Sequence, residues 1–312
     1  MNVLSLFDGL SCGQIALNKV DIKYDNYFAS EINKFAIKVT QDNYPNTIQL
    51  GDVMKVKGCD LPTIDLLIGG SPCTDFSFAG KKQGMITKDK IEITDLQTYL
   101  QLKEDEFEFQ GESFLFWEYI RLLNEVKPKF FLLENVKMSE KWKTVITNTL
   151  GVEPIFINSK LVSAQDRKRL YWTNIPNVTI PEDRNINFSD ISDDGWYCGS
   201  MRGRRVNPKT NSRDDYNYDI KIKQYIECRI DNKSNCLTTV IKDNVAVKTN
   251  APRRNLNEAE YRWLSPNEYE ALQTVPKDYT ACVSDSQRRT MMGNGWTVDV
   301  VAHIFSFLPK NN

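Results

Sequence analysis

The chain has 312 residues, 41% of them hydrophobic, and a formal net charge of −1 at pH 7. This length and hydrophobic fraction allow one large domain and a smaller one, each with a buried core. No stretch of 18 apolar residues occurs, which excludes a membrane-spanning helix, and the strand-like opening run predicts no signal peptide. The near-zero charge excludes a uniformly basic nucleic-acid binder but leaves room for a local basic patch.

The cysteine and histidine content argues against two kinds of site. Seven cysteines occur, and no two have CxxC spacing, so we expect no metal site and reduced thiols, as in a cytoplasm. The one histidine, His303, lies on an apolar, helix-like face, which indicates a packing residue. Mechanisms that need a Ser–His or Cys–His pair are therefore poorly supported.

The first half of the chain alternates short apolar runs with helical patterns. Such alternation predicts a parallel sheet covered by helices on both faces. Two further strands, 155–162 and 170–172, are expected at the far edge of the sheet. The other expected strands are 3–7, 27–30, 65–68 and 129–133, with helices at 13–19, 34–43 and 114–126 between them.

The second half differs in composition. Gly, Asn, Asp and Arg dominate over about 177–235, which predicts a second, irregular region. Helical signals then return, because capping boxes open at Ser265 and Ser284, the second before a helix that Gly293 ends. A last apolar helix is expected at 297–308.

Three sites follow successive predicted strands. Gly9 lies in the turn 7–13 after the first strand, Glu31 follows the second, and Asp52 is expected after the third. Glycines let a ligand approach a helix N-terminus, and acids at these places accept from ribose hydroxyls and an adenine amino group. Together the sites predict an adenosine-containing cofactor, although the turn 7–13 alone is equally an ordinary strand-to-helix connection.

Three further motifs carry chemistry. Cys73 follows Pro72 after a predicted strand, so we expect it at the carboxyl edge of the sheet beside any cofactor. Glu134 directly follows four apolar residues at the end of another predicted strand. An acid in that position indicates a functional carboxylate rather than a solvated surface charge. Arg167 and Arg169 are two residues apart and would point to one side of an extended segment. Taken alone, this last run is better explained as a solvated basic edge.

Together these motifs resemble those of the cytosine-5 DNA methyltransferases, in the family's order and over nearly all the chain outside about 179–235. The stretches 4–9, 29–31 and 163–174, with Trp296, look especially like the catalytic domain of animal de novo methyltransferases; the whole chain is also similar to bacterial and phage modification enzymes. The matching residues are Phe7 and Gly9; Pro72, Cys73, Phe76 and Ser77; Glu134, Asn135 and Val136; Gln165, Arg167 and Arg169; Leu272, Gln273 and Pro276; Gly293 and Asn294.

The resemblance implies a fold and a division of the chain. The implied fold class is α/β, a Rossmann-like S-adenosylmethionine-dependent methyltransferase with a mixed sheet, helices on both faces and a small irregular target-recognition domain. The catalytic, cofactor-binding domain is expected at 1–178, the target-recognition region at 179–262 and a C-terminal segment that returns to the catalytic domain at 263–312.

The resemblance also implies which residues act. Cys73 is the nucleophile that attacks carbon 6 of a flipped-out cytosine, and Glu134 contacts the ring nitrogen 3 and the exocyclic amine. Arg167 and Arg169 hold the base and a neighbouring phosphate. S-adenosylmethionine supplies the methyl group and leaves as S-adenosylhomocysteine, without a metal. The expected cofactor residues are Phe7, Asp8, Gly9, Gly13, Glu31, Ile32, Asp52, Val53, Pro72, Asn294 and Trp296, and the expected DNA-contacting residues are Gln165, Arg202, Arg204, Arg205 and Thr238.

Double-stranded DNA is the expected partner, in the cytoplasm of a bacterial or phage-infected cell. A cognate restriction endonuclease is an optional partner that the enzyme does not physically require. Methylation of RNA cytosine is the alternative, because relatives that methylate transfer RNA keep most of the motifs. The region 179–235 favours duplex DNA, since a separate reading module is expected there. A catalytically dead DNA-binding regulator would have lost the thiol or the glutamate, and both are present.

The segment 84–112 carries eight acids against three lysines. Phosphates repel such a surface, so we expect 88–110 to fold back on the large domain and to brace the loop after Cys73. A disordered acidic insertion is the alternative. The apolar anchors would be Tyr99, Leu100, Leu102, Phe107 and Phe109.

Overall fold

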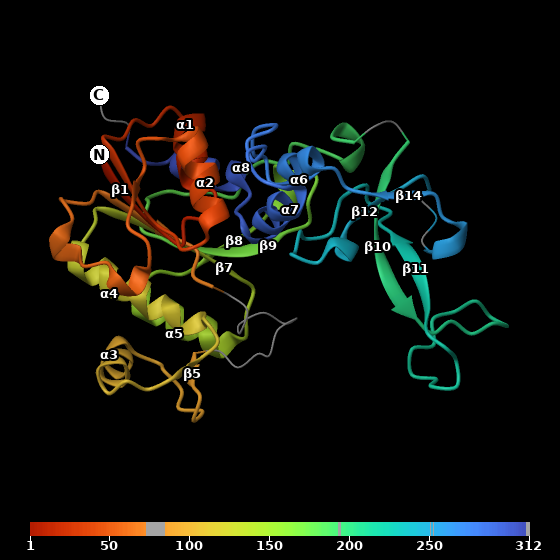
Figure 1. Ribbon diagram of the computed structural model, residues 1–312, viewed down its shortest axis with the longest axis horizontal. Coiled ribbons are helices and arrows are strands. Elements are labelled where there is room, and N and C mark those ends of the chain that lie inside the picture. Colours follow the sequence, from red (N-terminus) through yellow and green to blue (C-terminus); the bar gives the residue numbers. More distant parts are fainter. Residues whose placement is uncertain (73–84, 193–194, 250, 252, 310–312) are drawn as a thin grey trace. The chain divides into compact units, whose positions relative to one another are not determined.

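The computed structural model describes residues 1–72, 85–192, 195–249, 251 and 253–309, which form two compact units (Figure 1). The expected division at 178 and 262 follows function and stays a prediction, whereas the two units follow packing. Unit 1 comprises Met1–Ile157, Lys168–Pro181 and Val300–Asn312, and unit 2 comprises Asn158–Arg167 and Glu182–Asp299.

Unit 1 is built on a seven-stranded sheet in the order β3-β2-β1-β4-β7-β9-β8. The first five strands in that order pair in parallel, and β9 pairs antiparallel to β7, which confirms the expected mixed sheet. The strands are β1 Asn2–Leu6, β2 Asn26–Ser30, β3 Ile48–Gln49, β4 Leu66–Gly69, β7 Phe130–Val136, β8 Ile155–Asn158 and β9 Lys168–Thr173.

Successive residues of the central strands face opposite layers of helices, because side chains alternate along a strand. Leu67 packs in one core with Trp117 of α4 (Phe116–Val126). On the other face, a Cβ on Gly13 of α1 (Cys12–Lys19) would stand 2.4 Å from Ile68 Cδ1 and 2.6 Å from the Tyr27 hydroxyl. Helices therefore cover both faces, as expected. The other helices of this sheet are α2 Lys34–Asn43 and α5 Glu140–Leu150, the second of which the sequence patterns did not predict.

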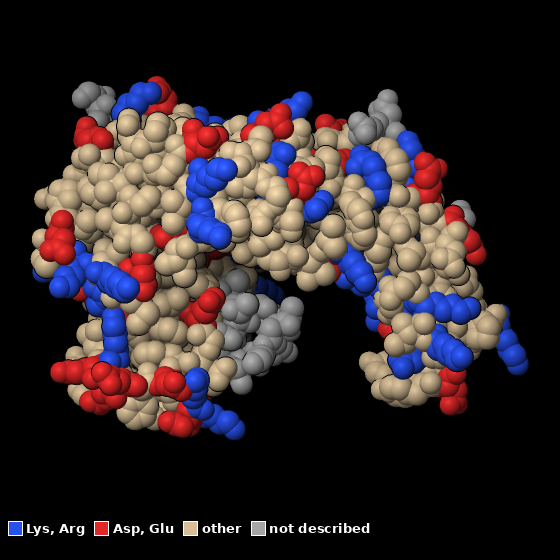
Figure 2. Space-filling view, viewed as in Figure 1, with Lys and Arg blue, Asp and Glu red and all other residues tan. Residues whose placement is uncertain are grey.

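The acidic segment is folded from residue 85 onward. It contains α3 (Leu96–Glu104) and a ribbon of β5 (Ile86–Thr87) with β6 (Phe109–Gln110). The Tyr99 hydroxyl, buried in the core of unit 1, donates to Glu118 of α4 at 2.5 Å. These contacts confirm that the segment folds back on the large domain, and the disordered alternative is wrong. Figure 2 shows acidic side chains gathered over this segment.

The expected apolar anchors of this segment meet the core unequally. Tyr99 and Leu102 are buried, and Leu100 and Phe109 pack partly buried against the core. Phe107 is 37% exposed, so it is not an anchor. The loop after Cys73, which the segment is expected to brace, lies outside the described residues.

Unit 2 contains a five-stranded antiparallel sheet in the order β13-β11-β10-β12-β14. The stretch expected to be irregular thus supplies β10 and β11, which corrects that expectation. Met201 and Ile226 form a core with Val245 and Val247, which come from later in the chain. Because the core is assembled from separate segments, the sequence around each strand shows few apolar repeats. The strands are β10 Tyr197–Arg204, β11 Lys223–Cys228, β12 Val245–Val247, β13 Arg253–Asn255 and β14 Tyr261–Trp263.

Three helices end the chain, at α6 Pro266–Leu272, α7 Asp285–Asn294 and α8 Val298–Phe305. The capping box at Ser265 is confirmed, but the Ser284 side chain makes no cap hydrogen bond and α7 continues past Gly293. His303 bonds the Thr179 carbonyl through Nε2 at 2.7 Å, in keeping with a packing residue. In the described parts of the chain, no helix has the length and apolarity needed to cross a bilayer.

Candidate active site

The loop after β1 is fixed to the turn after β2. Phe7 and Gly9 have backbone φ angles of 57° and 59°, in the left-handed region that residues other than glycine rarely adopt. The Gly9 N–H donates to Glu31 Oε2 at 2.8 Å, and Glu31 Oε1 accepts from the N–H groups of Ile32 and Asn33 at 2.8 Å each. A carboxylate has about four acceptor positions, so Glu31 can accept from a further donor.

The carboxyl ends of β1, β2 and β3 leave room for a ligand. A Cβ on Gly9 or Gly51 would meet no described atom within 4 Å. Ile32 is 75% exposed, and Asp52 accepts a backbone N–H at 3.0 Å through one of its two oxygens. Val53, by contrast, is buried in the core, so its side chain serves packing.

Asp8 is a partly buried acid beside these strand ends. Its Oδ1 accepts from the Tyr27 hydroxyl at 2.8 Å, whereas Oδ2 is shielded from solvent and has no hydrogen-bond donor among the described residues. Burial raises the pKa of Asp8 to about 6, an effect that the surrounding hydroxyl groups partly offset and the charge of Glu31 increases. Gly13 packs against Ile68 and Tyr27, and these two contacts explain why no side chain is tolerated there.

Replacing Asp8 with asparagine should change how stability depends on pH. The folded chain keeps the Asp8 proton up to about pH 6, whereas the unfolded chain loses it near 3.8. The protonated acid therefore favours folding below about pH 4, and that contribution is lost as the pH rises through 6. Relative to Asp8→Asn, the wild type should lose about 3 kcal/mol of unfolding free energy over this window. Urea unfolding at pH 4 and pH 7 measures the difference, and an equal difference at both pH values would contradict it.

The turn that leads to Cys73 is held by the end of β7. Asn135 donates through Nδ2 to Ser71 Oγ at 3.1 Å and to the Ser71 carbonyl at 3.4 Å. Pro72 follows, and Cys73 itself lies outside the described residues. Asn135 is not among the site residues expected from the sequence, although its position beside Glu134 was a signal for it.

Glu134 forms an ion pair with Arg169 across β7 and β9. The distance from Arg169 Nε to Glu134 Oε1 is 2.8 Å, and Glu134 is only 8% exposed. The antiparallel register that sets Val136 opposite Arg169 brings the two side chains together. A charge-assisted bond in so little solvent fixes the direction of the carboxylate.

Arg167 and Gln165 are buried in unit 2, where they have internal partners. Arg167 donates to the carbonyls of Leu237 at 3.0 Å and Gly295 at 2.9 Å. The Gln165 side chain donates to a carbonyl at the end of α6 and accepts from the Leu237 N–H at 2.7 Å. Arg167 thus has different partners from Arg169, and Gln165 does not reach a surface. The expected contacts of Arg167 with the base and of Gln165 with DNA stay predictions.

Asp243 connects two of the expected DNA-contacting residues. Arg202 pairs with Asp243 Oδ1 at 2.5 Å, and the Thr238 hydroxyl donates to Asp243 Oδ2 at 2.6 Å. One carboxylate therefore joins β10 to the segment that contains Thr238.

The other two expected DNA-contacting residues are also supported within unit 2. Arg204 binds Glu227 at two points, with distances of 2.7 and 2.8 Å. The Arg205 guanidinium lies 4.6 Å from the centre of the Tyr218 ring. Such contacts orient arginine side chains while leaving further N–H groups for a ligand.

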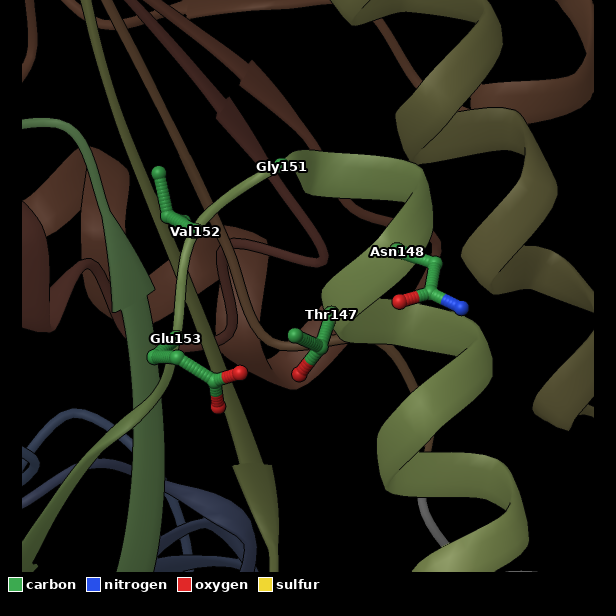
Figure 3. Close-up of a pocket in the computed structure, with 5 residues that line it drawn as sticks. All are labelled: Thr147, Asn148, Gly151, Val152 and Glu153. Atoms are coloured by element: carbon green, nitrogen blue, oxygen red, sulfur yellow. The ribbon is translucent and has the colours of Figure 1, made fainter.

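An open hollow at the C-terminal end of α5 is separate from these residues (Figure 3). None of the expected site residues lines it, and Thr147 Oγ1 at its wall accepts from Trp172 Nε1 at 3.0 Å. In the described ranges, no three His, Cys, Asp or Glu side chains gather as ligands for a metal ion. The lining residues are Thr147, Asn148, Gly151, Val152 and Glu153.

The mixed sheet with its parallel strands and helices on both faces defines the class as a Rossmann-like α/β methyltransferase fold. The chain superposes on the Dnmt2 methyltransferase of S. pombe with a TM-score of 0.64, covering 99% of this chain and 98% of that one at 16% identity. It superposes equally, with a TM-score of 0.64, on the methyltransferase EhMeth of Entamoeba histolytica, covering 99% and 97% at 15% identity. Identities this low show the fold alone.

The chain belongs to the C-5 cytosine-specific DNA methylase family, whose sequence profile matches residues 1–310. It is 27% identical over 319 aligned residues to the type II methyltransferase M1.ScrFI of Lactococcus lactis subsp. cremoris, covering 96% of this chain and 75% of the relative. It is 32% identical over 191 residues to the orphan methyltransferase M.SPRI of Bacillus phage SPR, covering 56% of this chain but only 38% of the relative. The family predicted from the motifs is thereby confirmed.

Proposed function

We propose that the chain transfers a methyl group from S-adenosylmethionine to carbon 5 of cytosine in double-stranded DNA. The observation that carries the proposal is the end of β7. There Glu134 is paired with Arg169, while the adjacent Asn135 holds the Ser71 turn that leads to Cys73. One strand end thus fixes the carboxylate and the turn that precedes Cys73 in the sequence, and the proposed reaction needs a carboxylate and a thiol together.

Carbon 5 of cytosine is a poor nucleophile, so the ring must first be activated. The target base is flipped out of the duplex, and the Cys73 thiolate adds to carbon 6. Glu134, fixed by Arg169, stabilises the attacked ring at nitrogen 3 and the exocyclic amine. When bound, S-adenosylmethionine would supply the methyl group to carbon 5, with its sulfur–methyl bond breaking to leave S-adenosylhomocysteine. A base then removes the carbon 5 proton, the bond between carbon 6 and sulfur breaks, and the aromatic ring and the thiolate are restored.

The strand ends of unit 1 support the choice of cofactor. Glu31 and Asp52 keep acceptor capacity for ribose hydroxyls and an adenine amino group, and the exposed Ile32 offers an apolar surface to the adenine ring. The open space at Gly9 leaves a place for the methionine part. Phe7, Gly13, Val53, Pro72, Asn294 and Trp296 complete the set expected from the resemblance.

One face of the sheet in unit 2 suits a DNA duplex. Arg202 and Arg204 share a face of β10, and the register sets Tyr225 and Lys223 of β11 opposite them. The other face carries Met201 into the core. Figure 2 shows Lys and Arg side chains over this part of the chain. Guanidinium groups oriented by carboxylates can read guanine, while a lysine suits phosphate.

Substitutions on this face should separate two roles. Lys223→Ala should weaken binding to all duplexes alike. The slope of the logarithm of the binding constant against the logarithm of the salt concentration should fall by about one, as expected for the loss of one phosphate contact. Arg202→Ala and Arg204→Ala should instead relax one position of the recognised sequence, by about 1–3 kcal/mol of discrimination. Base-resolution methylation profiles on a random duplex library distinguish these outcomes. Profiles and affinities unchanged in all three variants would identify the face as an ordinary solvated surface.

Transfer of labelled methyl groups to matched duplex DNA, single-stranded DNA and transfer RNA tests the substrate. Because the type II and orphan methyltransferase relatives are bacterial and phage proteins, we propose duplex DNA and a cytoplasmic enzyme with no need to contact a restriction endonuclease. Label mainly in duplex DNA is expected. Label mainly in RNA would replace the proposal with the alternative, and absence of label from every acceptor would favour a binding protein.

A further inference from the structure

Two segments of unit 2 meet at a contact that only glycine allows. A Cβ on Gly293, in the last turn of α7, would stand 2.6 Å from the carbonyl carbon and oxygen of Thr238 and 2.9 Å from the nitrogen of Thr239. The first segment, 236–239, contains the expected DNA-contacting Thr238. The second, 293–297, contains the expected cofactor residues Asn294 and Trp296.

Arg167 binds both segments with one guanidinium group. Nη1 donates to the Leu237 carbonyl at 3.0 Å, and Nη2 donates to the carbonyls of Gly293 at 3.3 Å and Gly295 at 2.9 Å. The side chain is 3% exposed, and its own N–H is bound by Asn158 Oδ1 at 3.1 Å. If either segment moved alone, a buried cation would lose its acceptors, which is strongly disfavoured.

A pair of buried amides makes the same connection in parallel. Gln165 accepts from the Leu237 N–H at 2.7 Å and donates to Gln273 Oε1 at 3.0 Å. Gln273 in turn donates to the Gly295 carbonyl at 2.9 Å and accepts from the Thr297 hydroxyl at 2.8 Å. Both glutamines are 0% exposed, so water cannot replace these partners.

The connection extends to the sheet of unit 2. The Thr238 hydroxyl and Arg202 share the two oxygens of Asp243, as described above. A change at the face of β10 is thus linked through Asp243 to 236–239, and from there to 293–297.

We propose that Arg167 is a positioning residue, which locks the segment 236–239 to the segment 293–297 and so makes DNA binding and cofactor binding mutually dependent. The inference rests on the proposed function, because it takes Thr238 to lie at the DNA and Asn294 and Trp296 at the cofactor. Linkage requires the effect to be reciprocal, so DNA should tighten cofactor binding by the factor with which the cofactor tightens DNA binding.

The test compares Arg167→Lys with Arg288→Lys. Lysine keeps the charge but has one ammonium group, which cannot reach acceptors on both segments. Arg288 is a matched control because it is 9% exposed and its guanidinium binds Thr280, Asn267 and Glu270 instead. The measurement is the Kd of S-adenosylhomocysteine, by titration calorimetry, with and without a saturating DNA duplex.

We expect DNA to lower this Kd about tenfold in the wild type and in Arg288→Lys, but less than twofold in Arg167→Lys. Gly293→Ala, which forces the two segments apart while keeping Arg167, should lose the effect as well and serves if Arg167→Lys fails to fold. A tenfold effect retained in Arg167→Lys or in Gly293→Ala would overturn the proposal. Wild-type protein that binds both ligands independently would overturn the coupling alone, whereas wild-type protein that binds neither would overturn the proposed function itself.

Discussion

Cys73→Ala is expected to lower the rate of methyl transfer by about 10⁴-fold or more while DNA affinity stays within about twofold of the wild type. The reason is that no other cysteine shares its place after a proline at a strand end. Cys12 is buried in α1, and burial raises the pKa of Cys198 to about 12, which disfavours the Cys198 thiolate near neutral pH. Initial rates with labelled cofactor and mobility shifts with duplex DNA measure the two quantities separately.

A duplex containing 5-fluorocytosine extends this test to the covalent step. Fluorine at carbon 5 blocks the final elimination, so the wild type should form a stable adduct that maps to Cys73. Cys282→Ala is the matched control, because Cys282 is a partly exposed cysteine outside the proposed site, and it should form the adduct normally. An adduct on another cysteine, or full turnover by Cys73→Ala, would remove the nucleophile from the account.

Glu134→Gln is expected to lower kcat by about 10²–10³-fold with a much smaller change in the KM for DNA. Glutamine keeps the shape of the side chain, but it removes the charge that pairs with Arg169 at 2.8 Å. The activated ring then loses a fixed electrostatic partner in a site with little solvent. Single-turnover rates at saturating DNA report this loss directly.

The pair itself is tested by a double-mutant cycle with Arg169→Lys. If Arg169 acts by holding Glu134, the two substitutions together should cost little more than Glu134→Gln alone. Additive losses would mean that the two residues act independently. Turnover of Glu134→Gln within about threefold of the wild type would show that the carboxylate is not part of the chemistry.

The sheet of unit 1 was predictable because its determinants are local. Each central strand is a short apolar run, and the connections after β1 and β2 carry their own helix signals, so β1, α1, β2 and α2 fall close to their expected places. The sheet of unit 2 was not predictable in this way, since the core partners of Met201 come from strands far along the chain.

The helix caps and the fold of the acidic segment were predicted from the sequence with unequal success. Ser265 and Glu268 complete a reciprocal capping box, whereas the Ser284 side chain makes no cap hydrogen bond although Gln287 stands at the matching position. The acidic segment was predictable as a folded appendage because its apolar residues were visible in the sequence. The partner of Tyr99 was not, since Glu118 lies in a different helix.

The motifs predicted a set of site residues, but they did not predict the partners that the fold gives to each of them. Glu134 and Arg169 were expected to act together on the base, and the structure gives them a direct ion pair. Arg167 and Arg169 are two residues apart, which suggested that they share a role. In the structure, however, Arg167 binds backbone carbonyls that only the folded chain brings together. Spacing along a strand does not reveal which partners the rest of the chain brings to each side chain.

The most direct test of the central claim is to identify the methylated nucleoside. Duplex DNA treated with the wild-type protein and S-adenosylmethionine is digested to nucleosides for mass spectrometry, and a second sample is sequenced at base resolution. The account predicts 5-methylcytosine at one recurring sequence in duplex DNA, and none in the sample treated with Cys73→Ala. Methyl groups on a nitrogen of cytosine or adenine, or 5-methylcytosine formed in RNA but not in duplex DNA, would contradict it.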